Sequence, residues 1–375
     1  MAIILYEKQA QREKFYPLTF TKPFAELHVG IFSVKKWWEK VTKQEVFVSN
    51  QEVCENDEVI YINAHLLPSE YIWDEIQNLK QGQSLKDGSG NTLAKKYFSE
   101  NESLHSFISK NSFLFIEYPS QLLQYHAKII EWQFHLIAKE RTSQKISSTN
   151  KMINEENIFI EEHVEMEYAI LNAKEGFVYI GANAVVMEGA AIRGAFALGE
   201  NSVVKMGAKI YGATSTGRKC TIGGEIKNTI FNHCSNKAHD GYLGDSIIGS
   251  WCNFGAGATN SNVKNTASEV GVYDYHLSKF LSSGKKFGVL MGDYSRVAIN
   301  SSINTGSSIG TCCNVFGNGL LPKFIPNFSW GTANKGSYEF EKAIGHINNW
   351  MALKGEKLNE QEFQTLKHIF ETLES

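Results

Sequence analysis

Aliphatic residues recur at every sixth position in the middle of the chain. The positions in register carry Ile180, Val186, Ile192, Leu198, Val204, Ile210 and, after Thr216, Ile222. A period of six fits neither an α-helix nor an amphipathic strand, but it fits short strands wound into a solenoid with one inward side chain per side. We therefore predict a stacked β-helix with three sides and about 18 residues per coil. A run of small apolar residues in an ordinary β-sandwich is the alternative.

The same period extends to both sides of this stretch. Because Ile158, Val164 and Ile170 are also six apart, we place the start of the β-helix at residue 158. After residue 222 the phase slips by two, and a common register returns at Ile230, Tyr242, Ile248 and Phe254. Segment Lys264–Phe287 breaks the pattern and predicts a loop between coils. With the period resuming from Met291 to Val315, the predicted β-helix covers residues 158–331.

The first 138 residues predict an α/β domain, because short apolar runs alternate with amphipathic ones. The expected strands are Ala2–Tyr6, Glu45–Ser49, Glu58–Asn63 and Ser112–Tyr118. The expected helices are Val34–Lys40, Tyr71–Asn78 and Ser120–Ala138. Residues 139–157, rich in Lys, Ser, Thr, Asn and Glu, are expected to form a linker.

Residues 332–375 predict a helical cap. Gly336–Leu353 carries apolar residues at helical spacing, and Asn359 followed by Glu362 is a capping-box arrangement for a second helix. We expect both helices to cover the open end of the β-helix, where strand edges would otherwise be exposed.

Composition narrows the classes of function. The formal charge is −3 with a pI near 6.4, and the basic runs are short, so no nucleic acid partner is expected. The N-terminus reads as a buried strand rather than a leader, and no stretch reaches the roughly 18 apolar residues of a membrane span. The cysteines lack metal-site spacing and are expected to be reduced core residues of a cytoplasmic protein: Cys54, Cys220, Cys234, Cys252, Cys312 and Cys313.

Polar residues are densest inside the β-helix pattern, between Gly224 and Asn262. If a coil is about 18 residues, Lys227 should stack on Asp245, and Tyr242 on Asn260. Lysines, a histidine, a tyrosine and asparagines then converge, and such a set can hold a phosphate and move a proton.

The motifs of this region resemble a known family. Glu225-Ile226-Lys227 precedes Ala238-His239, followed by Tyr242-Leu243-Gly244-Asp245 and Asn253-Phe254-Gly255-Ala256-Gly257. This series is similar to the acetyltransferase domain of the bifunctional N-acetylglucosamine-1-phosphate uridylyltransferase/glucosamine-1-phosphate N-acetyltransferase (GlmU-like) family. Pro17–Pro23 and Pro322–Pro326 are further marks of a shorter, divergent branch. The resemblance implies a left-handed β-helix of hexapeptide repeats, a homotrimer with sites between subunits, and acetyl-CoA as donor.

The resemblance also implies residue roles. His239 matches the catalytic base, and an imidazole can deprotonate an ammonium group so that it attacks a thioester. Asp245 or a backbone carbonyl would orient the ring. Ala256 matches the position whose main-chain N–H faces the developing oxyanion. The remaining matches are substrate ligands: Lys227 and Tyr242 for the sugar phosphate, Asn253 for the sugar or acetyl group, and Asn262 for the sugar.

Two positions depart from the family pattern. Lys209 stands where the family has an arginine on the phosphate, so a bidentate fork becomes a point charge. Val263 replaces a tyrosine beside Asn262, which removes one hydroxyl contact.

Every one of these residues has a structural alternative. His239 could simply bond a β-helix turn, and Lys227 and Lys209 could be solvated charges. Asn253 could belong to a ladder of asparagines that satisfies turn backbone.

The N-terminal domain departs further from the family. In the family a glycine-rich loop after the first strand holds a triphosphate, whereas Glu7–Arg12 contains no glycine. Where the family has a magnesium-binding aspartate, this chain has Asn63-Ala64, which supplies no carboxylate. Arg12 and Lys22 are candidate phosphate ligands or plain surface charges. Mg²⁺ is expected only if nucleotidylyl transfer survives, and no other metal is expected.

Three functions follow. The first is an acetyl-CoA-dependent N-acetyltransferase acting on an amino-sugar phosphate of the glucosamine 1-phosphate type, in nucleotide-sugar synthesis for the cell envelope. The second is a sugar-1-phosphate nucleotidylyltransferase of the UDP-N-acetylglucosamine diphosphorylase type. The third is a non-catalytic sugar-nucleotide-binding protein. The expected partners are a small sugar phosphate and an acyl-CoA.

Overall fold

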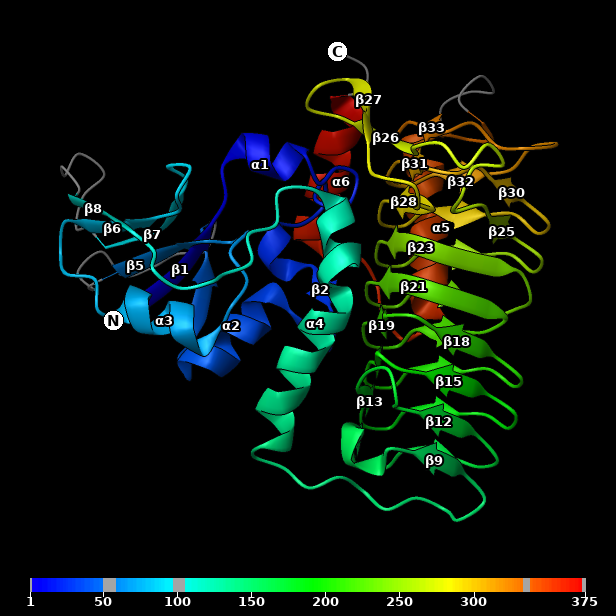
Figure 1. The fold of residues 1–375 in the computed structure, drawn as a ribbon. Coiled ribbons are helices and arrows are strands. Elements are labelled where there is room, and N and C mark those ends of the chain that lie inside the picture. Colours follow the sequence, from blue (N-terminus) through cyan, green and yellow to red (C-terminus); the bar gives the residue numbers. More distant parts are fainter. Residues whose placement is uncertain (1, 50–58, 97–104, 333–337, 373–375) are drawn as a thin grey trace. The chain divides into compact units, whose positions relative to one another are not determined.

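The chain forms two compact units (Figure 1). A computed structural model describes residues 2–49, 59–96, 105–332 and 338–372. The N-terminal unit comprises residues 1–12, 23–27 and 32–118, and the β-helix unit comprises residues 13–22, 28–31 and 119–375. This division differs from the predicted boundary at residue 138, because two short N-terminal segments and the helix that begins at Pro119 have their contacts with the β-helix.

The N-terminal unit is built on one mixed sheet of six strands. Its order is β4 (Val46–Val48), β1 (Ala2–Tyr6), β5 (Val59–Asn63), β7 (Thr92–Lys96), β6 (Gln83–Lys86) and β8 (His105–Ile108). β1 pairs in parallel with β4 and β5, and its central residues Ile3, Ile4 and Leu5 are buried. The helices of this region are α1 (Gln9–Glu13), α2 (Val34–Thr42) and α3 (Glu70–Gln77). The predicted α/β character is therefore confirmed.

One predicted strand of this sheet was wrong, and three of its strands were missed. Ser112–Tyr118 is not a strand, because its backbone bonds to the loop after β5, with Ile116 N donating to His65 O at 2.9 Å. Strands β6, β7 and β8 were not predicted. β6 and β8 carry little of the apolar alternation by which strands are recognised, and every described residue of β8 is exposed.

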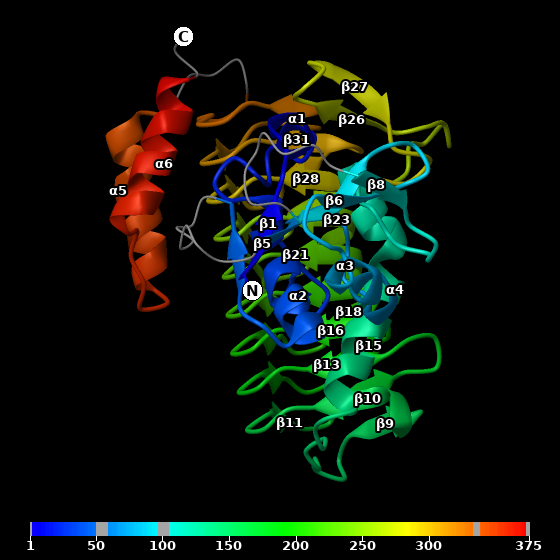
Figure 2. The same cartoon turned by 90° about the vertical axis from the view of Figure 1, so that its left-hand side faces the viewer.

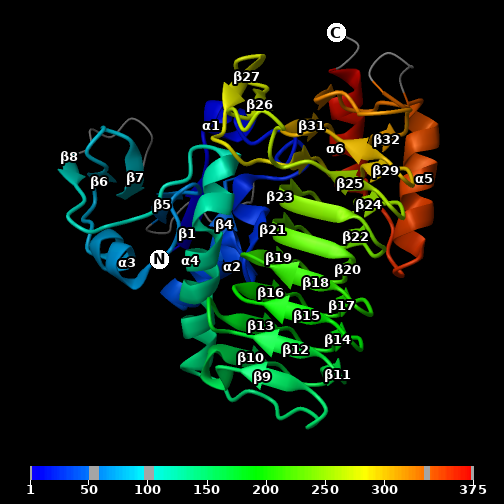
Figure 3. The ribbon, with the colours of Figure 1, turned by 45° about the vertical axis from the view of Figure 1, so that its right-hand side comes forward.

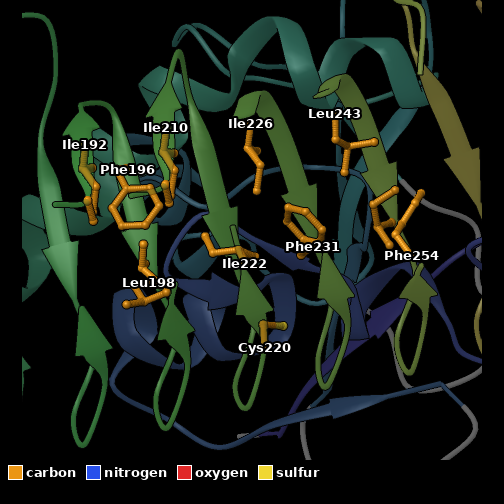
Figure 4. Packing of buried hydrophobic residues seen from close by; sticks show 14 of the residues in the cluster. Ile192, Phe196, Leu198, Ile210, Cys220, Ile222, Ile226, Phe231, Leu243 and Phe254 are labelled. Atoms are coloured by element: carbon orange, nitrogen blue, oxygen red, sulfur yellow. The ribbon is translucent and has the colours of Figure 1, made fainter. Parts of the chain in front are cut away.

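The second unit is a parallel β-helix, as the period of six predicts. Its short strands form a 13-stranded and an 8-stranded sheet in which each strand pairs with its counterpart one coil away. In one such column Val186 of β14 (Val185–Val186) pairs with Val204 of β17 (Val203–Val204), which pairs with Ile222 of β20 (Thr221–Ile222). The side chains of successive coils stack in a single interior column of apolar residues (Figure 4). This arrangement fits the left-handed β-helix.

The first coil is longer than predicted and starts earlier. β9 (Lys151–Ile153) already pairs with β12 (Ile170–Asn172), so the β-helix begins within the predicted linker. Ile170 is 46% exposed, whereas Leu171 is fully buried. The extra residues of this coil shift the inward position by one from the strict period.

The coils that follow residue 222 are shorter than 18 residues. Lys209 of β18 (Lys209–Tyr211) pairs with Glu225 of β21 (Glu225–Phe231), and Glu225 pairs with Tyr242 of β23 (Tyr242–Ile248). Because these steps are 16 and 17 residues, Lys227 stacks on Gly244 and not on Asp245 as predicted. Leu243 points into the core, and Tyr242 lies on the outer face.

The insertion at 264–287 contains an antiparallel hairpin of β26 (Gly271–Asp274) and β27 (Lys279–Ser282). The β-helix continues beyond it with its register intact, since Ile247 of β23 pairs with Leu290 of β28 (Val289–Met291).

The C-terminal helices lie along the side of the β-helix and not over its end. α5 (Phe340–Ala352) and α6 (Glu360–Glu371) pack together (Figure 2), and α5 runs beside β24 (Asn253–Phe254), β29 (Arg296–Val297) and β32 (Asn314–Val315) (Figure 3). Beyond α5, the Lys354 ammonium donates to Cys234 O at 3.2 Å. The capping box at Asn359 and Glu362 is confirmed. The end-covering position was wrong, because the apolar face of these helices packs on Tyr294 and Phe328.

The described cysteines are free and buried, as expected for core residues: Cys220, Cys234, Cys252, Cys312 and Cys313. Cys54 lies outside the described residues.

Candidate functional site

A buried carboxylate, Asp245, is the centre of a polar cluster on the face formed by β18, β21 and β23. Asn228 Nδ2 donates to Asp245 Oδ1 at 2.7 Å, and Asn262 Nδ2 donates to Asp245 Oδ2. Lys227 Nζ lies 4.0 Å from Asp245 Oδ2. Asp245 and Asn228 have φ of 47° and 46°, a left-handed conformation that Asp and Asn tolerate best among side-chain-bearing residues.

Two tyrosines complete this cluster. Tyr242 Oη accepts a hydrogen bond from Asn262 Nδ2 at 3.1 Å, and Tyr211 Oη donates to Glu225 Oε1 at 2.6 Å. Burial, followed by the nearby Asp245 charge, raises the pKa of Tyr242. The hydrogen bond to Glu225 raises the pKa of Tyr211 to about 12. Both phenols are therefore neutral at ordinary pH, and Tyr242, whose hydroxyl only accepts a bond here, can donate its hydrogen to a ligand oxygen.

Lys209 lies beside this cluster. It pairs with Glu225 on the next coil, which pairs in turn with Tyr242. Its side chain is exposed and makes no ion pair with any residue that the structure describes. Two ammonium groups, those of Lys209 and Lys227, therefore flank one stretch of the face.

His239 and Ala256 lie at the adjacent corner. Asn236 of β22 (Asn236–Lys237) pairs with Asn253 of β24, so the turns that follow these strands stack, with His239 on one coil and Ala256 on the next. Both residues are exposed. Within the described residues the His239 ring bonds neither Asp245 nor a backbone carbonyl, so neither of the two expected orienting contacts is present.

The turn that carries His239 is anchored by Lys237, which was not predicted to contribute. Lys237 occupies an interior position, stacked on Ile222, and is 1% exposed. Its ammonium donates to the carbonyl oxygens of His239 and Asp240. Burial lowers the pKa of Lys237 to about 8. The period did not mark Lys237, because the register that returns after residue 222 places Asn236 at the inward position.

Asn253 lies on a different side of the β-helix from Tyr242. It belongs to β24 in the 8-stranded sheet and stacks between Asn236 and Arg296. Tyr242 belongs to β23 in the 13-stranded sheet. One chain therefore brings together Lys227, Tyr242 and Asn262, and separates Asn253 from them by a corner.

In the N-terminal unit, Arg12 contacts a buried carboxylate at the end of β1. Arg12 Nε lies 3.9 Å from Glu7 Oε1, and His65 Nε2 lies 3.4 Å from Glu7 Oε2. Phe24 N donates to both Glu7 oxygens at 3.3 Å. The carboxyl ends of β1 and β5 are where open α/β sheets bind ligands. In this protein, donors at that edge that could hold a phosphate, the Arg12 guanidinium and the Phe24 N–H, face the Glu7 carboxylate instead.

At the same edge of the sheet, the residues that stand where a magnesium-binding aspartate was expected supply no carboxylate. Asn63 bonds His65 N at 3.1 Å through its carboxamide oxygen, and Ala64 has no ligand atom in its side chain. Among all described residues, no group of three or more His, Cys, Asp or Glu side chains is arranged to hold a metal ion.

Lys22 belongs to the β-helix unit and not to the unit that contains Arg12. Its ammonium lies 2.8 Å from Asp293 Oδ2 and donates to Ser250 Oγ at 2.8 Å. Lys22 is thus held in a structural ion pair within the β-helix unit.

Comparisons with known proteins agree with the resemblance. Residues 3–142 match the family model described as sugar nucleotidyl transferase. Over 101 residues the chain is 34% identical to the bifunctional protein GlmU of Methanocaldococcus jannaschii, covering 27% of this chain and 24% of that protein. It is also 34% identical over 93 residues to the bifunctional sugar-1-phosphate nucleotidylyltransferase/acetyltransferase of Sulfurisphaera tokodaii, covering 24% of this chain and 23% of that protein. The chain therefore spans about a quarter of the length of the curated relatives it matches.

Among solved structures, that of the polySia specific acetyltransferase NeuO is similar to this chain. The likeness has a TM-score of 0.27 and 13% identity over 55% of this chain and 94% of that chain. At that TM-score it supports no inference. Within the described part of the chain, no helix is long and apolar enough to cross a membrane.

Proposed function

We propose that the β-helix unit transfers an acetyl group from acetyl-CoA to the amino group of a sugar 1-phosphate. The observation that carries the proposal is the cluster of Lys227, Tyr242 and Asn262 around Asp245, next to an exposed histidine at the adjoining corner. The matches to bifunctional nucleotidylyltransferase/acetyltransferases support the reaction class.

In this reaction His239 acts as the general base. Its ring is exposed and forms no bond to a described side chain, so it is available to take a proton from the substrate ammonium group. The turn is held from inside by Lys237, which fixes where the ring can reach. When the amine attacks the thioester carbonyl carbon, Ala256, one coil away, presents its main-chain N–H to the oxyanion that forms on the carbonyl oxygen. Collapse of this intermediate breaks the C–S bond and releases CoA, which takes up a proton as the thiol.

The phosphate of the sugar is held by Lys227 and Lys209, with Tyr242 as hydrogen-bond donor. Asn262 is oriented by Asp245 and so presents a fixed amide to a sugar hydroxyl. Because these side chains are only partly buried, a ligand can reach them from solvent.

We further propose that the working form is a homotrimer with sites between copies. The corner that carries His239 also carries three large apolar side chains at the equivalent turn position of other coils: Tyr168, Met206 and Ile299, each 66–69% exposed. Exposed apolar side chains in line mark a protein interface. A second copy at this corner would complete the site with groups that one chain separates, Asn253 among them. A cytoplasmic location stays a prediction.

The direct test is His239→Ala, assayed by release of free CoA with glucosamine 1-phosphate as acceptor. We expect the turnover number to fall by at least about 100-fold, the usual contribution of a general base. The matched control is His163→Ala, which removes an exposed turn histidine of an earlier coil and should leave turnover unchanged. Full activity of His239→Ala in a folded trimer would refute the proposed mechanism.

A second candidate, sugar-1-phosphate nucleotidylyl transfer, is favoured by the family match to residues 3–142. It predicts pyrophosphate release from UTP and N-acetylglucosamine 1-phosphate, lost in Arg12→Ala. The geometry around Glu7 weighs against it, because a carboxylate already takes the donors. Absence of both turnovers with measurable binding of a sugar nucleotide would point instead to the non-catalytic binding protein.

A further inference from the structure

A buried guanidinium without a counter-ion lies on the side of the β-helix that α5 covers. Arg296 of β29 is 8% exposed, and its Nε and Nη2 atoms are buried without a hydrogen-bond partner. It forms no ion pair with any residue for which the structure gives a position. An isolated buried charge is costly, and a buried polar group left without a partner in a native structure calls for an explanation.

The neighbours of Arg296 are polar but uncharged. Arg296 pairs with Asn253 on one side and with Asn314 on the other, so the three outward side chains form a row across adjacent strands. Neither carboxamide forms a side-chain hydrogen bond to another described residue, and both asparagines are partly exposed. The row therefore combines two flexible amides with a fixed five-donor group.

The other groups near the guanidinium are aromatic rings and the buried thiols of Cys252 and Cys312. Trp350 of α5 lies with its ring 5.4 Å from the Arg296 guanidinium carbon, a cation–π distance. Tyr338 lies near enough to Arg296 to influence its charge electrostatically. The Tyr338 hydroxyl is already hydrogen-bonded to His346 Nδ1. Aromatic rings hold the guanidinium plane in place but supply no negative charge.

From this geometry we infer that Arg296, with Asn253 and Asn314 beside it, binds a small oxyanion, the phosphate or carboxylate group of a ligand, between β29 and α5. A guanidinium binds such groups through two parallel hydrogen bonds, which here would use Nε and Nη2. Each carboxamide can donate one further bond to the same anion. Asn253 is shared with the proposed transferase site, but Arg296 and Asn314 are not, and their sheet differs from that of the Lys227 and Tyr242 cluster.

The test measures thermal stability of the full chain in phosphate, in acetate and in chloride at equal ionic strength. A ligand that binds only the folded state raises the melting temperature in a saturable way, here by roughly 5 °C at high phosphate. A shift with phosphate alone assigns a phosphate group, and a shift with acetate as well assigns a carboxylate-tolerant site. No shift with either oxyanion beyond that with chloride overturns the inference.

Arg296→Met separates binding from a structural role. In buffer without oxyanion it should melt at or above the temperature of the natural protein, because removing a buried charge without a counter-ion relieves its desolvation. It should also lose the phosphate shift. The matched control, Arg193→Met, removes an exposed arginine that faces Glu175 and should keep the shift.

A direct binding measurement covers the case in which Arg296→Met does not fold. Phosphate titration of the natural protein should change tryptophan fluorescence, and Trp350→Phe should remove most of that change while keeping the thermal shift. A phosphate shift that persists in folded Arg296→Met, or a fluorescence change that is unaffected in Trp350→Phe, would contradict the assignment.

Discussion

Two buried carboxylates, Asp245 in the β-helix unit and Glu7 in the N-terminal unit, organise their surroundings in opposite ways. Asp245 accepts hydrogen bonds from two carboxamides, while the ammonium of Lys227 and the hydroxyl of Tyr242 remain partly accessible to a ligand. Glu7 accepts a hydrogen bond from the main-chain N–H of Phe24. The guanidinium of Arg12 and the imidazole of His65 both face its carboxylate. The first arrangement prepares donors for a ligand, whereas the second uses the donors internally. A family match alone does not distinguish these two outcomes.

The strongest test of this contrast between the two carboxylates is the removal of Asp245. Asp245→Ala should reduce kcat/KM for acetyl transfer by about 100-fold, because Asn262 and Lys227 lose the group that positions them. It should also cost about 1–3 kcal/mol of unfolding free energy, since buried amides lose their acceptor. Steady-state kinetics and urea unfolding measure the two effects. Glu162→Ala, at an exposed position of an earlier coil, is the control, and wild-type kinetics in Asp245→Ala would remove the cluster from the site.

The anchoring of the His239 turn can be tested through Lys237→Met. Methionine fills the interior position without a charge, so stability should be retained or raised. The turn loses its bonds to the ammonium, and we expect kcat to fall about tenfold with little change in KM. Lys237→Arg, which keeps a donor, should recover part of kcat. Equal losses in kcat and in stability would instead indicate a purely structural lysine.

Acid should lower the stability of the β-helix unit in particular. Burial lowers the pKa of His28 to about 4, of His126 to about 3 and of His233 to about 2, and all three belong to the β-helix unit. Burial keeps them neutral although a hydrogen bond such as that of His126 Nδ1 with Ala213 O, at 2.9 Å, favours the protonated ring.

The sign of this effect follows from proton uptake. An unfolded histidine binds a proton below its ordinary pKa of about 6.5, whereas these folded ones stay neutral to much lower pH, so unfolding takes up protons. Their contribution is complete above pH 6.5 and is lost as pH falls toward about 4. Urea midpoints of the β-helix unit should therefore decline over this window, and less steeply in His126→Gln. A midpoint independent of pH would contradict the assignment.

The smallest expected effect concerns Glu7. Glu7→Gln keeps one acceptor for Phe24 N and removes the charge that faces Arg12 and His65. We expect inorganic pyrophosphate to bind the variant roughly 3–10-fold more tightly than the natural protein. This is the range expected for a single charge contact at a partly buried position. Calorimetry measures this, with Glu45→Gln at an exposed position as control. Unchanged affinity would mean that Glu7 does not occupy an anion position.

The interior of the β-helix was predictable because every coil repeats one constraint. The residues from Ile180 to Ile222 that follow the period of six are all buried, as are those two positions earlier. The same logic failed by one residue at Ile170 and at Asp245, because coil length changes where turns are shortened or lengthened. A repeat predicts which residues point inward, but turn geometry decides which outward residues meet.

The candidate site was only partly predictable for the same reason. The motif that contains Lys227, Tyr242 and Asn262 indicated residues that the structure does bring together. It did not indicate that Asn253 faces another side, since that depends on a corner whose position no residue type marks. Lys237 and Glu7 were missed because each acts through a buried charge, and burial follows from tertiary packing.

The hairpin at 271–282 interrupts the chain without interrupting the ladder, since Ile247 and Leu290 pair as if they were one coil apart. The rungs on either side are therefore built independently of the segment that joins them. This junction offers a natural position for grafting: a fluorescent reporter or an affinity tag inserted at the hairpin tip would report on the neighbouring rungs while the stack below and above keeps its alignment.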